Sequence, residues 1–312
     1  MSISVVGANK RYGDFAALDD VSIEIPAGSL TSLLGPSGSG KSTLLRAIAG
    51  LDDLDSGTIV INGDDVSGAS PQKRDIGFVF QHYAAFKHLT VRDNIAFGLK
   101  IRKRAKKDID AKVDELLDIV GLTVFQKRFP AQLSGGQRQR MALARALAVD
   151  PKVLLLDEPF GALDAKVRED LRKWLRRLHE DMQVTTVLVT HDQQEALSFA
   201  DQVAIMRGGR FSQVGAPREI YDEPVDAREA AFLGDVVHLT GHRTTDGITC
   251  PLGIVTARGD VPRGDGEVVV VVRPEDLSLS DSPGCPHGTV QDVDYHGAHA
   301  MVRVALADGT VV

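Results

Sequence analysis

Long apolar runs are missing from this chain of 312 residues. No stretch approaches the ~18 consecutive apolar residues that a membrane-spanning helix needs, and residues 1–4 lack the charged-then-apolar pattern of a signal peptide. Only two cysteines occur, Cys250 and Cys285, too few for a disulfide framework and without zinc-ligand spacing. We therefore expect a protein of a reducing compartment that is soluble or peripherally attached to a membrane.

An excess of positive charge is also missing, because the net charge is −7. A protein of this charge has no general cationic field to hold polynucleotide phosphates, which argues against nucleic acid as a partner. One local basic run is the exception: Lys100, Arg102, Lys103, Arg104, Lys106 and Lys107. A solvated surface is the ordinary explanation of such a run, and a surface near anionic lipid or a membrane partner is the alternative.

Short apolar strands alternate with helical patterns over residues 1–235, which predicts an α/β domain with a largely parallel sheet. The buried-strand candidates are residues 30–34, 76–80, 153–156 and 186–190. A helical subdomain is expected at about residues 88–150. Thr90, with Asp93 three residues later, resembles a capping box at the start of one helix. A second helix is expected after Asp108, with Gly121 as its left-handed stop.

Residues 236–312 differ from the preceding residues in composition and pattern, because glycine, aspartate and valine dominate and helical periodicity disappears. Residues 268–272 form a run of valines, and Asp308-Gly309 is typical of a hairpin turn. These features predict a small all-β domain with a barrel-like form. The sequence stops at Val312, just where a returning strand should begin, so we expect the barrel to be cut short.

A glycine-rich segment between a strand and a helix predicts a phosphate-binding loop. It satisfies G-x-x-x-x-G-K-[ST] with the residues Gly35, Pro36, Ser37, Gly38, Ser39, Gly40, Lys41 and Ser42, and Thr43 follows. The glycines let backbone N–H groups face phosphate oxygens, and the helix start adds partial positive charge. Lys41 is expected at the β- and γ-phosphates of a nucleotide, and the Ser42 hydroxyl at Mg²⁺.

Two acidic residues, Asp157 and Glu158, end the apolar strand at residues 153–156. A carboxylate at the end of a buried strand is well placed for the magnesium shell, and this role fits Asp157. Glu158 would then orient or deprotonate the attacking water as general base. Read alone, the pair is equally compatible with an ordinary acidic strand end.

A second helix start carries glycines, in the segment Leu133, Ser134, Gly135, Gly136 and Gln137. Ser134 is a good N-cap, with Gln137 at the reciprocal capping position. Two glycines there leave backbone N–H groups open to an anion. With this pentapeptide the chain resembles the ATP-binding cassette (ABC) family, in which this segment binds the γ-phosphate of ATP held by the opposite subunit.

Further positions match the family one by one over residues 3–235. Tyr12 resembles the aromatic residue that stacks on adenine, and Gln81 the glutamine that touches magnesium and water and reports to the membrane subunit. His191 resembles the histidine that senses the γ-phosphate, although a lone histidine there is more often structural. Residues 161–164 resemble the dimer-contact loop, with glycine where serine is common.

The resemblance implies an ATPase that uses ATP and Mg²⁺ and works as a homodimer. Residues 272–276 resemble a motif of the accessory OB/TOBE-type β-domain in importer ATPases. Partners implied are two transmembrane permease subunits and an extracytoplasmic solute-binding protein, with the chain peripheral on the cytoplasmic face of the membrane.

The cargo is the least determined feature. Residues 81–90 and 93–99 look most like the sulfate/thiosulfate import branch of the family, and residues 211–215 lean the same way. Polyamine, iron, molybdate and sugar importers are alternatives. A non-transport ABC ATPase acting on nucleic acid is a further alternative, but the chain lacks the long heptad insertions of chromosome-type members and the second cassette of translation-type members.

Overall fold

The computed structural model describes residues 1–161, 163, 165–245, 247–256, 266–280, 285–295, 297 and 299–312. The chain divides into two compact units, Met1–Ile220 and Tyr221–Val312. The division lies some fifteen residues before the boundary expected at 235/236. The domain boundaries expected from the sequence, residues 1–235 and 236–312, stay a prediction.

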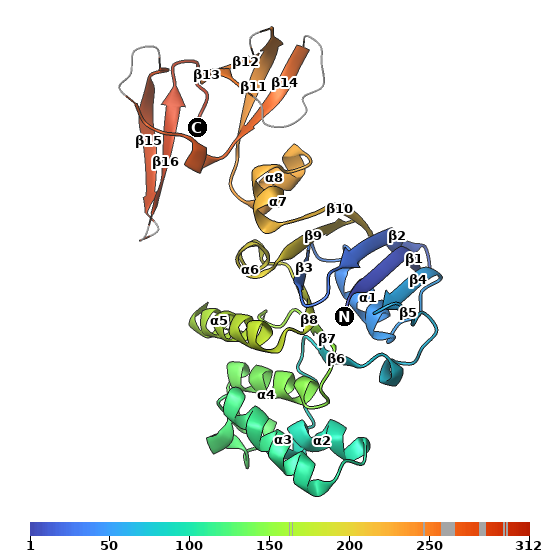
Figure 1. The fold of residues 1–312 in the computed structure, drawn as a ribbon. Coiled ribbons are helices and arrows are strands. Elements are labelled where there is room, and N and C mark those ends of the chain that lie inside the picture. Colours follow the sequence, from blue (N-terminus) through green and yellow to red (C-terminus); the bar gives the residue numbers. More distant parts are fainter. Residues whose placement is uncertain are drawn as a thin grey trace. The chain divides into compact units, whose positions relative to one another are not determined.

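A six-stranded sheet in the order β10-β9-β3-β8-β7-β6 forms the centre of the first unit (Figure 1). All its neighbouring pairs are parallel except β10 with β9. The expectation of a largely parallel sheet is therefore confirmed. The bounds of the strands are β3 Leu30–Leu34, β6 Ile76–Val79, β7 Val153–Asp157, β8 Thr185–Thr190, β9 Gln202–Arg207 and β10 Arg210–Gly215.

A second sheet of the first unit is antiparallel, in the order β2-β1-β4-β5. The alternation of strands and helices did not predict it. Its strands are β1 Ile3–Tyr12, β2 Phe15–Ile25, β4 Ser56–Ile61 and β5 Asp64–Asp65.

Helices connect the parallel strands, and three of them form the helical subdomain between β6 and β7 (Figure 1). Within this subdomain α4 packs against α2, α3 and β6. The helices are α1 Lys41–Ala49, α2 Val91–Ile101, α3 Lys106–Ile119, α4 Gly135–Leu147, α5 Ala165–Met182, α6 Gln193–Phe199, α7 Pro217–Asp222 and α8 Ala227–Leu233.

The helix ends follow the expected capping chemistry. The Thr90 hydroxyl accepts a hydrogen bond from the backbone N–H of Asp93, and Gly121 adopts the left-handed conformation after α3, with φ of 66°. The N-cap at Thr90 and the left-handed stop at Gly121 are confirmed, but the capping box is not reciprocal, because the Asp93 carboxylate accepts from the Thr90 hydroxyl at 2.7 Å. The helix after the glycine-rich loop starts at Lys41, because Gly40 in the left-handed region turns the chain directly into it.

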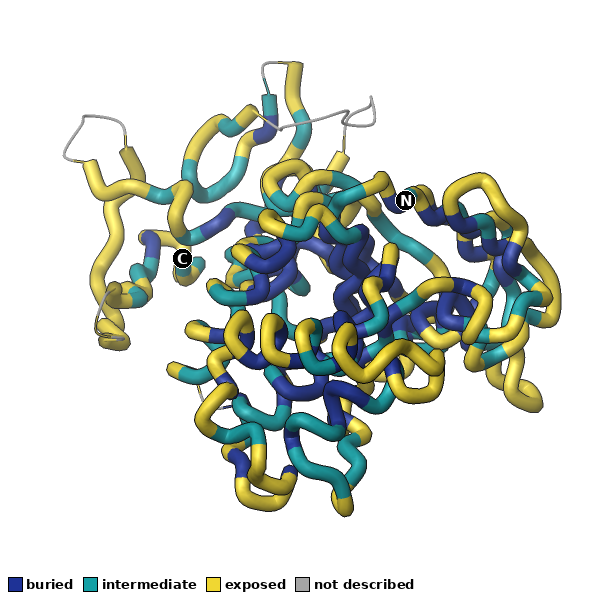
Figure 2. The backbone as a smooth tube through the Cα atoms, turned by 60° about the horizontal axis from the view of Figure 1, so that its bottom comes forward, coloured by how far each residue is buried: buried dark blue, intermediate teal, exposed yellow. Residues whose placement is uncertain are grey.

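Two apolar clusters cover opposite faces of the six-stranded sheet. Along β7, Leu154 and Leu156 join the cluster that includes α2 to α5, while Val153 and Leu155 join the cluster that includes α1 and the antiparallel sheet. This alternation is what a strand buried on both faces requires. Figure 2 shows the buried segments gathered in the interior of this unit.

The second unit is β-rich after α8, as expected, but its described strands lie in two sheets and do not close a barrel. The sheet in the order β13-β12-β11-β14 is antiparallel, and β15 pairs with β16. The Asp308-Gly309 turn is confirmed, and after it Val312 pairs with Val304. The strands are β11 Val237–Thr244, β12 Gly247–Cys250, β13 Gly253–Val255, β14 Gly266–Val272, β15 Gly288–Tyr295 and β16 Ala300–Leu306.

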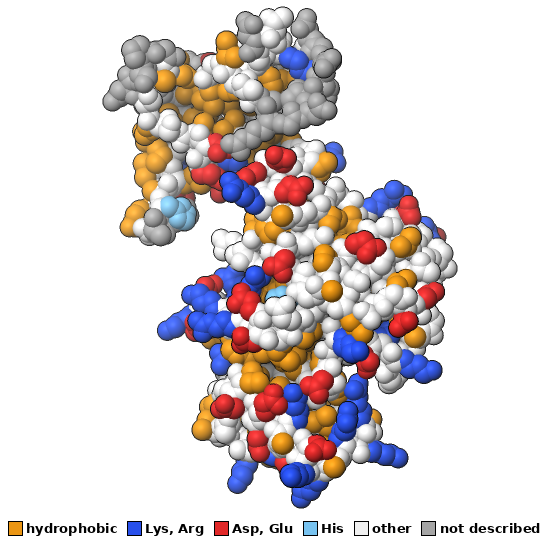
Figure 3. Space-filling model, in the orientation of Figure 1, with side chains coloured by type: hydrophobic (Ala, Val, Ile, Leu, Met, Phe, Trp, Pro, Cys, Tyr) orange, Lys and Arg blue, Asp and Glu red, His pale blue; other side chains and the backbone are white. Residues whose placement is uncertain are grey.

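The basic run lies at the end of α2 and the start of α3, and its residues are exposed. Lysine and arginine side chains project from the end of the first unit that these helices form (Figure 3). Lys100 pairs with Asp93 at 2.7 Å, and Arg102 lies 3.8 Å from Asp75. Across the described ranges, no helix combines the length and apolar character needed to cross a membrane.

Substitution of a central core residue should measure how much the packing of β7 contributes. Leu155 is fully buried, so Leu155→Ala should lower the free energy of unfolding by about 2–5 kcal/mol, through lost burial and the cavity that remains. Val124 is 84% exposed, so the control Val124→Ala should change the free energy of unfolding by less than about 0.5 kcal/mol. Urea denaturation followed by circular dichroism measures both, and equal effects would contradict the assignment of Leu155 to the core.

Candidate functional site

Four neighbouring parallel strands end at one edge of the central sheet, and the predicted site residues follow those ends. The glycine-rich loop follows β3, His191 follows β8, Glu158 follows β7 and Gln81 lies just after β6. The strands run in the order β3-β8-β7-β6, so the residues that follow them become neighbours. Such an edge of carboxyl ends is where open α/β sheets bind ligands.

The glycine-rich loop leaves no room for side chains at two of its glycines. A Cβ on Gly35 would lie 2.2 Å from the carbonyl oxygen of Met206, and one on Gly40 would lie 2.3 Å from that of Ala17. Both residues have positive φ, 152° and 106°. Gly38, with φ of 78°, has nothing within 4 Å of its Cβ position, so its requirement for glycine is conformational.

Lys41 is buried, with 5% of its surface exposed. Its ammonium group donates to the carbonyl oxygens of Gly35 at 2.7 Å and Pro36 at 2.9 Å, and to the Ser39 hydroxyl at 3.3 Å. Burial lowers the pKa of Lys41, while the nearby carboxylates of Glu158 and Asp157 act in the opposite direction. A cation held by neutral dipoles is a suitable partner for an incoming anion.

Ser42 and Asp157 meet across the loop and the end of β7. The Ser42 hydroxyl donates to Oδ1 of Asp157 at 2.8 Å. Burial raises the pKa of Asp157, and the hydrogen bond from Ser42 lowers it. Among the described residues no group of three His, Cys, Asp or Glu could hold a metal. One carboxylate beside one hydroxyl is instead the donor set that Mg²⁺ uses when phosphates and water supply the remaining ligands.

Gln81, Glu158 and His191 converge from three different strands. The side-chain amide of Gln81 donates to Oε2 of Glu158 at 2.8 Å, and Nδ1 of His191 lies 3.6 Å from the same oxygen. Glu158 has a left-handed backbone, with φ of 44°, and its N–H donates to the Val189 carbonyl at 3.0 Å. A carboxylate fixed on two sides at the sheet edge can orient a water molecule.

Tyr12 lies at the end of β1 with half of its surface exposed. Its hydroxyl donates to Oδ2 of Asp52 at 3.2 Å, and Nε of Arg46 in α1 donates to the same oxygen at 2.8 Å. Asp52 therefore links the ring to the helix that follows the glycine-rich loop. The ammonium group of Lys10 lies 5.6 Å from the centre of the ring, and the half of the residue that stays exposed is compatible with a stacking role for Tyr12.

The second glycine-containing helix start has the predicted capping box. Ser134 accepts from the N–H of Gln137 at 3.3 Å, and the Gln137 side chain accepts from the N–H of Ser134 at 3.0 Å. A Cβ on Gly136 would lie 2.6 Å from Val167, while Gly135 is half-buried. Among the described residues, no hydrogen bond or ion pair joins residues 134–137 to residues 35–43, so the two glycine-containing helix starts are not linked within the chain.

One connection near the site was not predicted from the sequence. Arg168 of α5 donates to the Leu163 carbonyl at 3.2 Å and to the Asp192 carboxylate at 3.2 Å. It thus ties residue 163 to the residue after His191. The sequence could not have identified Arg168, because it is one arginine among many charged residues of the same helix. Ala162 and Asp164 of the expected dimer-contact loop lie outside the described residues.

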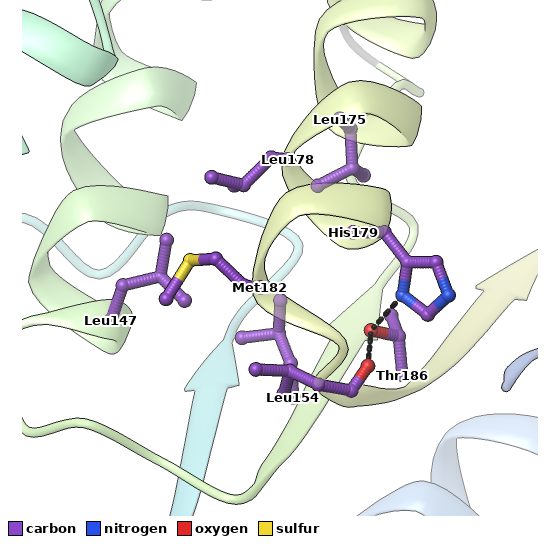
Figure 4. Close-up of a pocket in the computed structure, with 8 residues that line it drawn as sticks. Leu147, Leu154, Leu175, Leu178, His179, Met182 and Thr186 are labelled. Carbon is purple, nitrogen blue, oxygen red and sulfur yellow. Dashed lines mark hydrogen bonds between the residues drawn. The ribbon is translucent and has the colours of Figure 1, made fainter. Parts of the chain in front are cut away.

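A separate small hollow lies between α4, α5 and the sheet (Figure 4). Four of its eight lining residues are leucines, and none of the eight belongs to the predicted site. Nδ1 of His179 lies 3.2 Å from the Thr186 hydroxyl, and burial lowers the pKa of His179 against the effect of Asp201. This histidine is a satisfied core residue, and the hollow is part of the packing.

The chain matches two family models, that of the ABC transporter over residues 18–161 and that of the TOBE domain over residues 270–312. It is 72% identical over 240 residues to the sulfate/thiosulfate import ATP-binding protein CysA of Nocardia farcinica, covering 77% of this chain and 72% of the relative. The protein of that name from Bordetella bronchiseptica is 52% identical over 321 residues, covering 100% of this chain and 90% of the relative.

Solved cassettes resemble the first unit. The dimeric structure of MJ0796, a bacterial ABC transporter cassette, matches with a TM-score of 0.63 and 35% identity, covering 69% of this chain and 99% of that one. CbiO1 from Clostridium perfringens, part of the ABC transporter complex CbiONQ, matches with a TM-score of 0.66 and 30% identity, covering 71% of this chain and 90% of that one.

The raised pKa of Asp157 predicts a stability effect with a definite sign. A carboxyl group whose pKa is higher in the folded state stabilises the fold only while protonated, and this contribution is lost as the pH rises through the folded pKa. In EDTA without nucleotide, Asp157→Asn should therefore be more stable than the unsubstituted protein at about pH 7.5, with a difference that shrinks toward about pH 4. Urea denaturation of both proteins across this pH range measures the difference. If Asp157→Asn were less stable than the unsubstituted protein at about pH 7.5, the pKa of Asp157 would not be raised by folding.

Proposed function

This chain belongs to the ABC transporter family of ATP-binding proteins, and from that membership we propose that it is the ATP-hydrolysing subunit of a sulfate and thiosulfate importer. The observation that carries the proposal is the convergence of Lys41, Ser42–Asp157 and Gln81–Glu158 at one sheet edge. An identity of 52% with a sulfate/thiosulfate import protein over the whole chain supports the cargo.

ATP and Mg²⁺ fit the residues present. Gly35 and Gly40 let the loop lie against backbone carbonyl groups that a Cβ would overlap, Lys41 offers a buried cation, and Tyr12 offers a half-exposed ring for the base. Ser42 and Asp157 would hold Mg²⁺, with Gln81 beside them. When bound, the metal would neutralise phosphate charge and polarise the bond to the γ-phosphate.

Hydrolysis would depend on positioning by Glu158, Gln81 and His191. Glu158 is the candidate general base for water because its Oε2 faces both other side chains. The Gln81 amide holds that carboxylate in one orientation, and His191 offers a donor for the phosphate side. Positioning and fixed charge account for most catalysis of phosphoryl transfer.

The site would be completed by a second copy of the chain. Ser134, Gly135, Gly136 and Gln137 form an anion-binding helix start that is not joined to the glycine-rich loop of its own chain. The partner's segment would then lie over the nucleotide, as the dimeric cassette structures among the relatives support. ATP binding would close the pair, and release of phosphate would reopen it.

Membrane partners follow from the proposed role. Two permease subunits would carry the channel, and an extracytoplasmic binding protein would deliver the anion, with this subunit peripheral on the cytoplasmic face. The β-rich second unit would be a regulatory domain of TOBE type. Polyamine, iron, molybdate or sugar importers would use the same ATPase chemistry, so the ATPase site supports the motor role and does not by itself identify the cargo.

A mixing experiment tests the shared site. Lys41→Ala removes the cation of the phosphate loop, and Ser134→Arg blocks the opposing helix start at a cost of about 1 kcal/mol for the lost cap. Each variant alone should be inactive. A mixture should recover hydrolysis, because one of the two sites in a mixed dimer contains an intact Lys41 and an intact Ser134.

Steady-state ATPase assays of the two variants and of their mixture measure this effect. A mixture of Lys41→Ala with the double variant Lys41→Ala/Ser134→Arg is the control and should stay inactive. If the first mixture is also inactive although dimers form, both elements act within one chain.

The cargo is tested with the assembled transporter in proteoliposomes. Sulfate- or thiosulfate-loaded binding protein should stimulate ATP hydrolysis and anion uptake, while molybdate, spermidine, ferric iron and maltose should not. Glu158→Gln should abolish both activities yet retain nucleotide binding, because it keeps the shape and removes the base. Glu115→Gln, at an exposed surface pair with Lys112, is the matched control. Stimulation by another anion or by DNA would overturn the sulfate assignment.

A further inference from the structure

The loop after β6 has an unusual backbone. Tyr83 and Ala84 are consecutive non-glycine residues with positive φ, 61° and 41°. Left-handed conformations are unfavourable for residues with a Cβ and persist only where surrounding contacts impose them. The turn begins directly beside Gln81, because the N–H of Tyr83 donates to the carbonyl oxygen of Phe80 at 2.8 Å. The conformation of these two residues therefore determines the direction in which Gln81 leaves the strand.

One side chain holds both strained residues. Arg145, in the last turn of α4, donates through Nη1 to the carbonyl oxygen of Ala84 at 2.6 Å and through Nη2 to that of Tyr83 at 2.8 Å. Its guanidinium also lies 5.4 Å from the centre of the Phe86 ring. The planar fork of an arginine suits two neighbouring carbonyl groups, which a lysine could not hold together.

Arg145 has these carbonyl groups as partners instead of a carboxylate. In the part of the chain that the structure describes, no ion pair includes Arg145, and burial alone lowers its pKa. A cation removed from water needs compensating dipoles. The two carbonyl oxygens supply them, so the strained turn and the half-buried guanidinium stabilise each other.

The far end of the loop has its own anchor. Asn94 of α2 is fully buried, accepts from the N–H of Phe86 at 2.9 Å, and donates to the carbonyl oxygens of Phe86 and Leu89, both at 3.1 Å. With residues 86–89 fixed by Asn94, the contacts of Arg145 control the remaining stretch between Gln81 and Ala84. That stretch connects α4, whose other end carries Ser134, to the carboxylate of Glu158.

We propose that Arg145 is a positioning residue for ATP hydrolysis, which keeps Gln81 directed at Glu158 by holding the Tyr83–Ala84 turn. The inference rests on the proposed roles of Gln81 and Glu158. Arg145 acts through Gln81, since its hydrogen bonds and its ring contact are to the loop after β6. It also makes the position of α4, and hence of the 134–137 helix start, a determinant of how the Glu158 carboxylate is held.

The first test is Arg145→Lys, which keeps the positive charge and loses the two-carbonyl fork. Turnover of the assembled transporter should fall by about tenfold, while the affinity for ATP, measured by calorimetry on the Glu158→Gln background, should stay within about twofold. Arg102→Lys is the matched control, because Arg102 also donates to a backbone carbonyl of this subdomain, that of Val149, and should leave turnover unchanged. Unchanged turnover in Arg145→Lys would overturn the proposal.

The second test separates positioning from general destabilisation. If Arg145 acts through Gln81, the double variant Arg145→Lys/Gln81→Ala should be no slower than Gln81→Ala alone. Glycine adopts the left-handed conformation readily, so adding Ala84→Gly to Arg145→Lys should recover at least half of the lost turnover. Multiplicative losses in the double variant, or no recovery with glycine, would mean that Arg145 only supports the fold.

Failure of this inference can be told apart from failure of the proposed function. If Gln81→Ala and Glu158→Gln both lower turnover but Arg145→Lys does not, the proposed site stands and the role of Arg145 falls. If Glu158→Gln retains full turnover, the proposed hydrolytic site itself is wrong.

Discussion

Parallel pairing of β3, β8, β7 and β6 is the constraint on which the rest of the molecule depends. Leu34 pairs with Thr190, Asp157 with Val189, and Val79 with Leu156, so the four strands end nearly level. Each strand then delivers one functional segment to the same edge, although the segments come from residues 35 to 191 of the chain. Apolar side chains on both faces of the sheet hold this alignment, so the chemistry of the site depends on packing some distance below it.

The buried ammonium group of Lys41 makes this edge suitable for a ligand that brings negative charge. Lys41 is buried among carbonyl groups, and the half-buried carboxylate of Asp157 accepts from the Ser42 hydroxyl. Burial opposes the charged form of both groups. A ligand that binds only the folded state stabilises it, so an anion bound at Lys41 would offset the cost of burying that cation.

The helical subdomain supplies what the sheet edge lacks. The strands β6 and β7 are neighbours in the sheet, but α2, α3 and α4 lie between them in the chain. This insertion starts after Gln81, which follows β6, and ends before β7, which Glu158 follows. Both ends of α4 matter, since Ser134 opens it with free backbone donors and Arg145 near its end holds the loop beside Gln81. The single helix α4 therefore carries both the capped start at Ser134 and the arginine that contacts the loop after β6.

Local chemistry was sufficient for the sequence to determine the phosphate loop, the caps at Thr90 and Ser134, the strands at β3 and β7, and the identity of the acidic pair. Each is set by residues within a few positions of one another, where glycine conformation, capping and hydrophobic runs act directly. The antiparallel sheet was not foreseen, because pairing of β1 with β4 depends on residues about fifty positions apart. Only the tertiary structure decided that Gln81 meets Glu158, that Arg168 bridges Leu163 and Asp192, and that Arg145 faces two strained carbonyl groups. Long-range contacts of this kind come from strand order and helix packing, which no local pattern of amino acids encodes.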